Sequence, residues 1–576
     1  MGESAYTYLF VPESAFGPTN NCVGIAHRLA ARGHRIVFAA ERSWEGRLTP
    51  LGFEEQLVDL SPPAPEPQSA GQFWKDYIAT IAPQFLRPTV EQLSTVIRPI
   101  WEELIDGVRY VEPRLRELLD DVRPDVIVED NVVGFPALVT AGVPFVRIVS
   151  CNPLEVPGPG VPPAFSGLAA DDAASFPAFR DAYRRTHLDL WREFDTWYRS
   201  QGAPGLPELS FIAPGDLNLY VYPKELDYRD ARPLPDTWHR LDSSVRETDA
   251  PVELPDGFAT GARPVVYFSL GSLGGADVGL MSRVIDALAD EPYDVIVSTG
   301  PRHDEITLAD NMWGGEFLPQ TRLLPTADAV ITHGGNNTVT EAMHFGKPMV
   351  VLPLFWDQYD NAQRVHERGV GRRLDTYRAT ADDIREAVRR VLDDDALRRR
   401  LARTSRRIRE ADGVGRAADL LEAVSRRREC ASPRPARHAS TPRLPRNVEH
   451  KSPLAIRLLR DADTRRRAPR RAPSPRRTLE PHRTRHPARA VGPRVRAGET
   501  HGAREQPGSA QRGRRRAAGG VVAHQVSRSQ QHRARRPLDA GHHVRAPVDA
   551  VAAVDVEVPR GPEHHGAARR RAAGGV

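Results

Sequence analysis

The chain has 576 residues and a formal net charge of +5, which hides a division near Arg428. Residues 1–429 carry a net charge of −17 and all 39 Phe, Trp and Tyr residues, whereas residues 430–576 carry +22 and no aromatic residue. The last part cannot bury enough apolar surface to offset its chain entropy, so we predict a disordered tail over 429–576. Three scattered cysteines exclude a disulfide framework, and no apolar run approaches the roughly 20 residues that a membrane helix needs.

Strands alternate with helices through the first half of the remaining chain. A strand near residues 6–11 precedes the loop "AFGPTNN" (15–21), and a helix follows over about 22–32. Later strands, including "RIVFAAE", "PDVIVEDN" and the final strand "LNLYVYPKEL", are separated by helical stretches. This alternation predicts a parallel, doubly wound sheet, so we expect an N-terminal Rossmann-like domain over 1–235. The polar, turn-rich residues 236–262 are expected to form an interdomain linker.

The same pattern restarts at "RPVVYFSLGS" and continues through "KPMVVLPLFWDQYDNAQRV". It predicts a second Rossmann-like domain over 263–428, with a pair of amphipathic helices near its end. The expected fold class is therefore α/β, with two doubly wound domains facing each other across a cleft. Ligands of such sheets bind outside the carboxyl ends of the strands, so the cleft is the expected site.

The stretch "THGGNNTVTE", from Thr332 to Glu341, carries the most chemistry. A buried strand is expected to end in a glycine turn, and Asn337 or Thr338 could cap the next helix. A helix N-terminus presents unpaired N–H groups and binds phosphate. His333 beside it could donate to an anionic oxygen, and Glu341 could accept from ribose hydroxyls. A plain capped glycine turn is the alternative for this stretch alone.

Two other strand ends carry polar residues. In "PLFWDQYDN", Asp357 and Gln358 could bind sugar hydroxyls, or Asp357 could cap the following helix. In "SLGS", Ser272 could contact a phosphate, or the stretch could be an ordinary strand-to-helix turn.

Together these stretches resemble the donor-binding signature of family 1 glycosyltransferases, the GT-B group that includes macrolide glycosyltransferases, actinobacterial members and plant UDP-glycosyltransferases. The spacing agrees: eight positions separate His333 from Glu341, and sixteen separate Glu341 from Asp357. The resemblance covers residues 1–425. It implies inverting transfer of a hexose from UDP- or TDP-hexose, as co-substrate, to a hydroxyl of a small apolar acceptor, without a metal or a bound cofactor.

The resemblance also implies roles for single residues. Phe317 would stack on the base, Gln320 would contact base or ribose, and Glu341 would bind the ribose. Asp357 and Gln358 would hold the hexose. The diphosphate would lie against His333, Gly334, Gly335 and Thr338, with Asn337 near the sugar or phosphate and Ser272 nearby. The segment from Phe317 to His333 is shorter than in plant members, so the resemblance does not decide whether the base of the donor is uracil or thymine.

The general base is the departure from the family pattern. Members typically carry a histidine held by an aspartate, but this chain has Pro18 at the histidine position and Asp130 at the aspartate position. Asp130 could act directly or through a water, or Glu13 at the end of the first strand could be the base. Alternatively the acceptor needs little deprotonation, or transfer is lost. A GT-B epimerase, a hydrolase and a silent sugar-nucleotide-binding protein are therefore rival functions.

The acceptor is expected to bind to the helices of 71–120 and the loop of 151–170. Four aromatic residues could line its pocket or belong to the core: Trp74, Trp101, Phe165 and Trp191. The chain start lacks a signal-peptide pattern, which predicts a cytoplasmic location.

The basic tail could bind nucleic acid through phosphate groups. However, it has no aromatic residue for base stacking and a single lysine, Lys451, which argue against this function. An Arg-rich, Lys-poor composition is typical of GC-rich DNA read out of frame, so we interpret 429–576 as a frameshift or mispredicted product. A natural disordered tail is the alternative.

Overall fold

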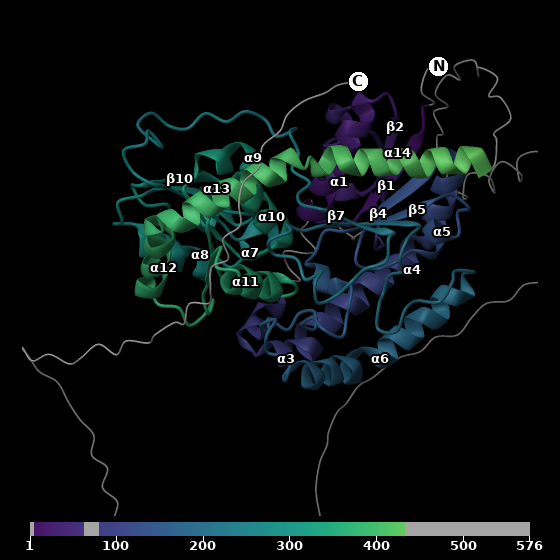
Figure 1. Cartoon of the computed structure of the whole chain (residues 1–576), viewed down its shortest axis with the longest axis horizontal. Coiled ribbons are helices and arrows are strands. Elements are labelled where there is room, and N and C mark those ends of the chain that lie inside the picture. The colour runs from purple at the N-terminus through teal and green to yellow at the C-terminus, as the bar shows by residue number, and fades with distance from the viewer. Residues whose placement is uncertain (1–4, 63–79, 432–576) are drawn as a thin grey trace, which may run out of the picture. The chain divides into compact units, whose positions relative to one another are not determined.

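The computed structural model describes residues 5–62 and 80–431, and they form two parallel β-sheets flanked by helices (Figure 1). The first sheet has the strand order β3-β2-β1-β4-β5-β6-β7, and the second has the order β10-β9-β8-β11-β12-β13. Two doubly wound α/β sheets, as expected from the sequence, are confirmed. Trp74 and the tail beyond residue 431 lie outside the described residues.

The elements around the first sheet come from the N-terminal part of the chain. Its strands are β1 (Thr7–Pro12), β2 (Arg35–Glu41), β3 (Glu54–Val58), β4 (Val126–Asp130), β5 (Phe145–Val149), β6 (Leu217–Val221) and β7 (Trp238–Leu241). Its helices are α1 (Phe16–Ala31), α3 (Thr89–Gln92), α4 (Arg98–Val122), α5 (Pro136–Val139) and α6 (Phe176–Ser200).

The elements of the second sheet follow in the same alternation. Its strands are β8 (Val265–Ser269), β9 (Asp294–Ser298), β10 (Met312–Gly315), β11 (Ala329–Thr332), β12 (Met349–Val351) and β13 (Gly371–Arg373). The helices are α7 (Gly271–Gly274), α8 (Val278–Leu288), α9 (Gln320–Leu323), α10 (Asn336–Phe345), α11 (Gln358–Glu367), α12 (Ala381–Asp393), α13 (Asp395–Glu410) and α14 (Gly413–Ala431).

The alternation of side chains in β1 explains why the first sheet is covered on both faces. Leu9 and Val11 belong to the core that contains residues of α4 and α6. Tyr8 and Phe10 point to the other face, where they pack with α1 and α14. Because both faces are covered, the strand is apolar throughout rather than alternately polar, as is usual in parallel sheets.

Helix α1 begins earlier than the sequence suggested. It starts at Phe16, not near residue 22, so Pro18 lies in its first turn rather than in a loop. The first helical hydrogen bond runs from Thr19 N to Ala15 O, so the N–H groups before Thr19 have no acceptor within the helix. A proline is tolerated there because the hydrogen it lacks would be unpaired in any case.

The expected linker contains a strand. β7 pairs in parallel with β6, so "LNLYVYPKEL" is not the last strand of the first sheet. Trp238 and Leu241 of β7 are buried, whereas the two residues between them are half-buried. A four-residue strand within a polar stretch gives too short a pattern to be recognised from the sequence.

Helix α14 was missed as a separate element, and it packs against the first sheet although it follows the second in the chain. Figure 1 shows it lying along α1 and β1. Its Ser425 hydroxyl hydrogen-bonds Tyr8 at 2.9 Å, and its Glu422 contacts Arg32 and His34 at 3.1 and 3.2 Å. The C-terminal helix therefore completes the core of the N-terminal sheet.

We predict that ending the chain at Asp412 lowers its thermal stability relative to a chain that ends at Ala431. The shorter chain loses the buried Ala417, Ala418 and Leu421, and a large buried apolar side chain contributes about 1.5–3 kcal/mol. Differential scanning calorimetry of both chains measures the effect. Equal unfolding temperatures would contradict this role of α14.

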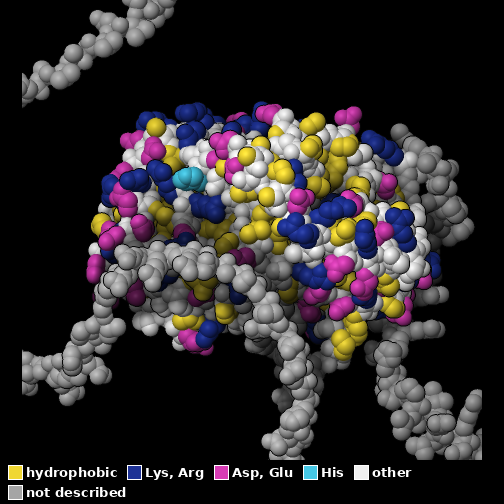
Figure 2. Space-filling view, turned by 90° about the horizontal axis from the view of Figure 1, so that it is seen from below, with side chains coloured by type: hydrophobic (Ala, Val, Ile, Leu, Met, Phe, Trp, Pro, Cys, Tyr) yellow, Lys and Arg dark blue, Asp and Glu magenta, His cyan; other side chains and the backbone are white. Residues whose placement is uncertain are grey.

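The surface seen in Figure 2 carries Lys and Arg side chains interspersed with Asp and Glu, so the described residues form no continuous basic stripe on that face. Within the described ranges, the helices also fall short of the combined length and hydrophobicity that a membrane crossing requires.

Candidate active site

Each sheet has one point where the strand order reverses, and some of the predicted site residues lie at these two points. In the first sheet the reversal is between β1 and β4, and in the second between β8 and β11. Glu13 follows β1 and Asp130 ends β4, whereas Gly271 follows β8 and His333 follows β11. Ligands of open α/β sheets bind beyond the carboxyl ends of the strands at such points.

The two reversal points lie against each other. A Cβ atom built on Gly17, in the first turn of α1, would lie 3.6 Å from Cβ of Asn337 in the first turn of α10. The buried Asn336 Nδ2 donates to the carbonyl oxygens of Ser150 at 2.8 Å and Val221 at 3.0 Å, which follow β5 and end β6. The starts of α1 and α10 therefore meet where the two sheets join.

The imidazole of His333 occupies a slot between two glycines. A Cβ atom on Gly271 would lie 2.6 Å from His333 Cε1, and one on Gly335 would lie 2.5 Å from Nε2. Only glycine leaves room for the ring on both sides. Burial lowers the pKa of His333 to about 4, so the ring is neutral at pH 7 and can donate one N–H. Ser272, half-buried in α7, directly follows the first of these glycines.

The first turn of α10 is not capped by a side chain, so the capping predicted for Asn337 or Thr338 is wrong. Gly335 is the N-cap residue, and no side chain accepts from the N–H groups of the first turn. Asn337 Nδ2 instead donates to Glu341 Oε1 at 3.0 Å, and Thr338 Oγ1 accepts from Gln320 Nε2 at 3.4 Å. Uncapped N–H groups at a helix start are available to an anion.

Gly334 forms the tight turn that the sequence predicted. Its φ is +87°, and a Cβ atom there would lie 2.7 Å from Val351 Cγ1. Its carbonyl oxygen accepts from Asn361 Nδ2 at 2.9 Å. The turn is therefore restricted to glycine by both its backbone conformation and its surroundings.

Glu341 is buried in a network that includes a residue the sequence reasoning missed. Its Oε2 accepts from Gln320 Nε2 at 2.5 Å, and its Oε1 lies 2.9 Å from Arg246 Nη1. Gln320 also accepts from the hydroxyl of Tyr267 at 3.2 Å. Arg246 belongs to the stretch expected to be a linker, where a single arginine gives no signal of burial.

Phe317 is 48% exposed, and its ring stacks on Phe16 at 5.5 Å between centroids with an interplanar angle of 26°. Phe16 is the first residue of α1, and its ring also lies 5.2 Å from that of Trp44. The aromatic side chain predicted to meet the base therefore has an aromatic neighbour from the first sheet. Phe16 lies within "AFGPTNN", but nothing in that stretch indicated its contact.

Asp357 is the N-cap residue of α11 and Gln358 its first residue, but the Asp357 side chain makes no capping hydrogen bond. Asp357 Oδ2 accepts from the backbone N–H of Asn152 at 2.8 Å, across the junction of the two sheets. Gln358 Oε1 accepts from the backbone N–H groups of Leu354 and Phe355 at 3.0 and 3.2 Å. Burial raises the pKa of Asp357 to about 7, so near neutral pH this carboxyl exchanges between its charged and neutral forms.

A small cavity with an aromatic wall lies beside Asp357. It is lined by Trp101, Cys151, Asn152, Glu155, Ala164, Phe165, Trp356, Asp357 and Asp360. The ring of Trp356 lies 4.7 Å from Phe165 and 5.1 Å from Trp101. Two residues predicted for the acceptor pocket therefore come together, but Trp191 lies elsewhere and donates to Ser210 O at 3.1 Å. With a volume of about 10 Å³, the cavity is no larger than one water requires, so a larger ligand needs the two sides to separate.

One carboxyl of α11 fastens the loop of 151–170 to the second sheet. Asp360 Oδ2 accepts from Phe165 N at 2.6 Å, and Oδ1 accepts from Gly167 N at 2.8 Å. Arg373 Nη1 donates to Gly167 O at 2.9 Å. Because Phe165 lines the cavity, Asp360 holds one residue of its aromatic wall in place.

We predict that Asp360→Asn loosens this loop. Asparagine offers one acceptor oxygen where the carboxyl offers two, so one backbone N–H is left unpaired at a cost of about 1–3 kcal/mol. Hydrogen exchange of the Phe165 and Gly167 amides should become faster, whereas Asp375→Asn, at an exposed residue, should leave it unchanged. Unchanged exchange in Asp360→Asn would contradict the fastening role.

The pH dependence of this contact has a definite sign. Burial raises the pKa of Asp360 from 3.8 to about 7, so the folded protein retains a proton that the unfolded chain has lost. The stability from this group is therefore full below about pH 4 and is lost as the pH rises to 7. This part of the wild-type pH dependence should be absent from Asp360→Asn.

The two candidate bases differ in exposure. Glu13 is half-buried, and its carboxylate accepts from Ala15 N at 2.9 Å and Ser14 Oγ at 3.1 Å. Asp130 is 2% exposed, with Oδ2 lying 3.9 Å from Cys22 Sγ. Burial raises the pKa of Glu13, and it raises that of Asp130 well above its usual value. The two residues are neighbours, because Glu13 N donates to Asp130 O at 2.8 Å.

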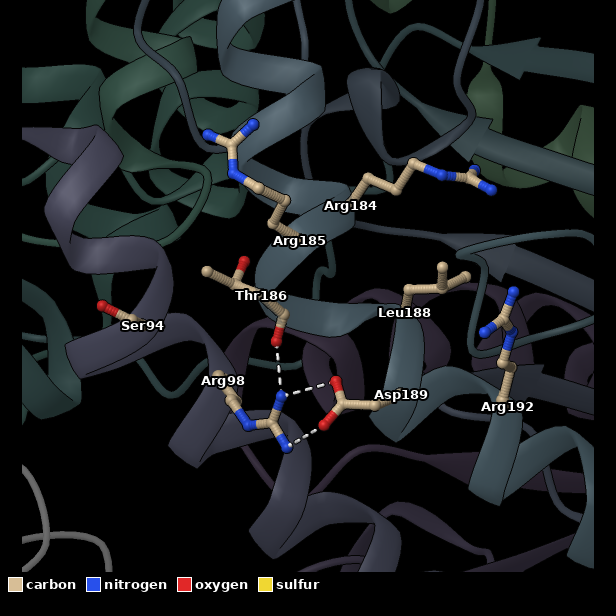
Figure 3. A pocket seen from close by; sticks show the side chains of 8 residues that line it. All are labelled: Ser94, Arg98, Arg184, Arg185, Thr186, Leu188, Asp189 and Arg192. Carbon is tan, nitrogen blue, oxygen red and sulfur yellow. Dashed lines mark hydrogen bonds and ion pairs between the residues drawn. The ribbon is translucent and has the colours of Figure 1, made fainter.

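A separate, open hollow lies between α6 and the start of α4 (Figure 3). Its lining residues are Ser94, Arg98, Arg184, Arg185, Thr186, Leu188, Asp189 and Arg192. Arg98 and Asp189 point toward each other in Figure 3 and are joined by hydrogen bonds of 2.8 and 3.0 Å. The hollow contains none of the predicted site residues, so the candidate active site remains at the junction of the sheets.

Comparison with known proteins indicates which family of proteins this chain resembles. Residues 243–439 match the family model described as "UDP-glucoronosyl and UDP-glucosyl transferase". The NDP-glycosyltransferase YjiC of Bacillus subtilis (strain 168) is 27% identical over 416 residues, which cover 72% of this chain and 96% of that protein. The chain is therefore similar to family 1 glycosyltransferases over most of its length. The match begins directly after β7, so it includes Arg246 with the residues of the second sheet.

Two further comparisons show that the likeness includes the N-terminal half of this chain. The oleandomycin glycosyltransferase of Streptomyces antibioticus is 26% identical over 420 residues, covering 71% of this chain and 89% of that protein. The crystal structure of the kitacinnamycin glycotransferase has a TM-score of 0.52 at 23% identity and covers 73% of this chain and 99% of that one. At this identity the structural likeness concerns the fold, which is GT-B.

Proposed function

We propose that this glycosyltransferase transfers a hexose from UDP- or TDP-hexose to a hydroxyl group of a small apolar acceptor, with inversion and without a metal. The observation that carries the proposal is the slot that holds His333 beside the uncapped start of α10. A neutral imidazole and free helix N–H groups suit the charge that develops on a departing diphosphate.

The remaining donor contacts follow from the arrangement of the second sheet. Gly334, Gly335 and Thr338 would border the diphosphate with Ser272, and Asn337 would lie between phosphate and sugar. Glu341 and Gln320 share a hydrogen bond and would meet the ribose, while the exposed ring of Phe317 would stack on the base. Asp357 and Gln358 would hold the hexose.

Glu13 is our choice for the general base. It is the more exposed of the two carboxyls, and its raised pKa brings it closer to the operating pH, as a base requires. In the transfer step, Glu13 takes the proton of the acceptor hydroxyl, and the acceptor oxygen forms a bond to the anomeric carbon. The bond from that carbon to the diphosphate oxygen breaks on the opposite face, and the diphosphate leaves with the electron pair. Asp130, acting through a water, is the alternative base.

The acceptor would enter between Trp101, Phe165 and Trp356. Their rings supply an apolar wall beside Asp357, and the present cavity is too small for an aglycone. Binding therefore requires the contacts of Asp360 and Asn152 across the junction to open. This opening would also admit the hexose of the donor.

A donor screen tests the proposal. Release of nucleoside diphosphate from UDP- and TDP-hexoses is measured with and without added aglycones, in the presence of a chelator. Acceptor-dependent release that persists under chelation is expected. Acceptor-independent turnover would indicate an epimerase or hydrolase, and binding without turnover a silent protein; the glycosyltransferase relatives favour neither.

A further inference from the structure

We infer that Arg246 is a positioning residue of the donor site: it orients Glu341 so that one carboxylate oxygen keeps a free acceptor position for a ribose hydroxyl. The inference rests on the proposed function, which places Glu341 at the ribose. Arg246 lies outside the motifs that predicted this site, in the segment that connects the two sheets.

The geometry of the ion pair supports this role. The side chains of Arg246 and Glu341 are 10% and 2% exposed, and Nη1 lies 2.9 Å from Oε1. Asp249 holds the other edge of the guanidinium, accepting from Nε at 2.7 Å and Nη2 at 2.9 Å. Asp249 is in turn fixed by the hydroxyl of Thr321 at 2.8 Å, next to Gln320. The guanidinium is therefore held on two sides and has little freedom to turn.

The partners of Glu341 show which of its oxygens remains available. Oε1 interacts with Arg246 and with Asn337 Nδ2, whereas among the described residues Oε2 accepts a hydrogen bond from Gln320 Nε2 alone. An ionised carboxylate has about four acceptor positions, two on each oxygen. Because Arg246 and Asn337 occupy Oε1, the free position is on Oε2.

The connecting segment has a second tether, which offers a matched control. Arg322 donates from Nε to Asp249 O at 2.8 Å and from Nη2 to Glu247 O at 3.0 Å. It anchors the same segment through these two backbone oxygens, not through Glu341. If Arg246 acted only as a tether, loss of Arg322 should have a similar effect.

The test is calorimetric binding of UDP and 2′,3′-dideoxy-UDP to the full chain. The wild type is expected to bind UDP about tenfold more tightly, because only UDP has hydroxyls to donate to Glu341. Arg246→Met should reduce this preference to about twofold at pH 7. Arg322→Met should retain it. In Glu341→Gln the preference should be lost, with no further loss on adding Arg246→Met.

The outcomes separate this inference from the proposed function. A wild type that binds neither nucleotide overturns the proposed function itself. A wild type that binds both equally overturns the ribose role of Glu341, and with it the role of Arg246. If Arg246→Met keeps the full preference for UDP over 2′,3′-dideoxy-UDP, the inference about Arg246 is wrong. It is also wrong if Arg322→Met loses as much of this preference as Arg246→Met does. If Arg246→Met does not fold, Arg246→Lys replaces it, with an expected loss of at least threefold in the preference because lysine lacks the rigid fork.

Discussion

Replacement of His333 by alanine is expected to lower kcat/KM for the nucleotide-sugar donor by about two to three orders of magnitude, the usual effect of removing one donor to a developing oxyanion. The imidazole lies in its slot between Gly271 and Gly335, at the start of α10. Alanine removes the N–H that would face the diphosphate. Initial rates at varied donor concentration and saturating acceptor measure the loss.

Two variants make this result specific. His344 is a half-buried histidine in the last turn of α10, where it hydrogen-bonds Ser243 at 2.9 Å, so His344→Ala should leave donor kinetics nearly unchanged. Gly335→Ala should reproduce much of the loss in kcat/KM although His333 itself is not substituted. The φ of Gly335 is −57°, which alanine adopts readily, but the new Cβ would lie 2.5 Å from His333 Nε2 and displace the ring. Normal donor kinetics in His333→Ala would remove the proposed phosphate contact.

Glu13→Gln is expected to lower kcat by about 10²- to 10⁴-fold with little change in the KM for the donor, which is the contribution typical of a general base. The pH profile adds a second readout. Burial raises the pKa of Glu13 above 4.5, so kcat of the wild type should rise with pH as this carboxyl loses its proton. Glutamine cannot titrate, and the variant should lack that acidic limb.

Glu41→Gln is the control for this substitution. Glu41 ends the neighbouring strand β2, and its carboxylate accepts from Ser43 N at 3.3 Å, so the same chemical change there should leave kcat nearly intact. Loss of activity in Asp130→Asn, with normal activity in Glu13→Gln, would transfer the role to Asp130. Normal transfer in both variants would mean that neither carboxyl is the base.

Pro18 has a structural explanation that its sequence context concealed. The glycine and proline of "AFGPTNN" suggested a loop, but both lie in the first turn of α1, where a missing N–H costs nothing. The same turn brings Gly17 against Asn337 and places Phe16 on Phe317. The segment that lacks the family's histidine therefore still forms one wall of the junction.

Local pattern was sufficient for the fold class and for the strand ends where we expected the donor site. Alternating apolar strands and helices indicated two parallel sheets, and strand ends followed by Gly, His, Asn and Asp marked where ligand chemistry belongs. These features depend on residues that are close in the sequence, and the order of strands follows from the parallel arrangement. His333, Gly334 and Asp357 follow the strands β11 and β12, as we expected, and their contacts with a donor stay a prediction.

Long-range packing determined which side chains are buried and which form ion pairs, because both depend on residues far apart in the chain. Nothing near Arg246 indicated that it would meet Glu341, 95 positions later, nor that Asp360 would accept from Phe165, 195 positions earlier. The return of α14 to the first sheet and the exposure that separates Glu13 from Asp130 are also tertiary properties. A buried charge needs a partner, but only the folded chain determines which residue supplies it.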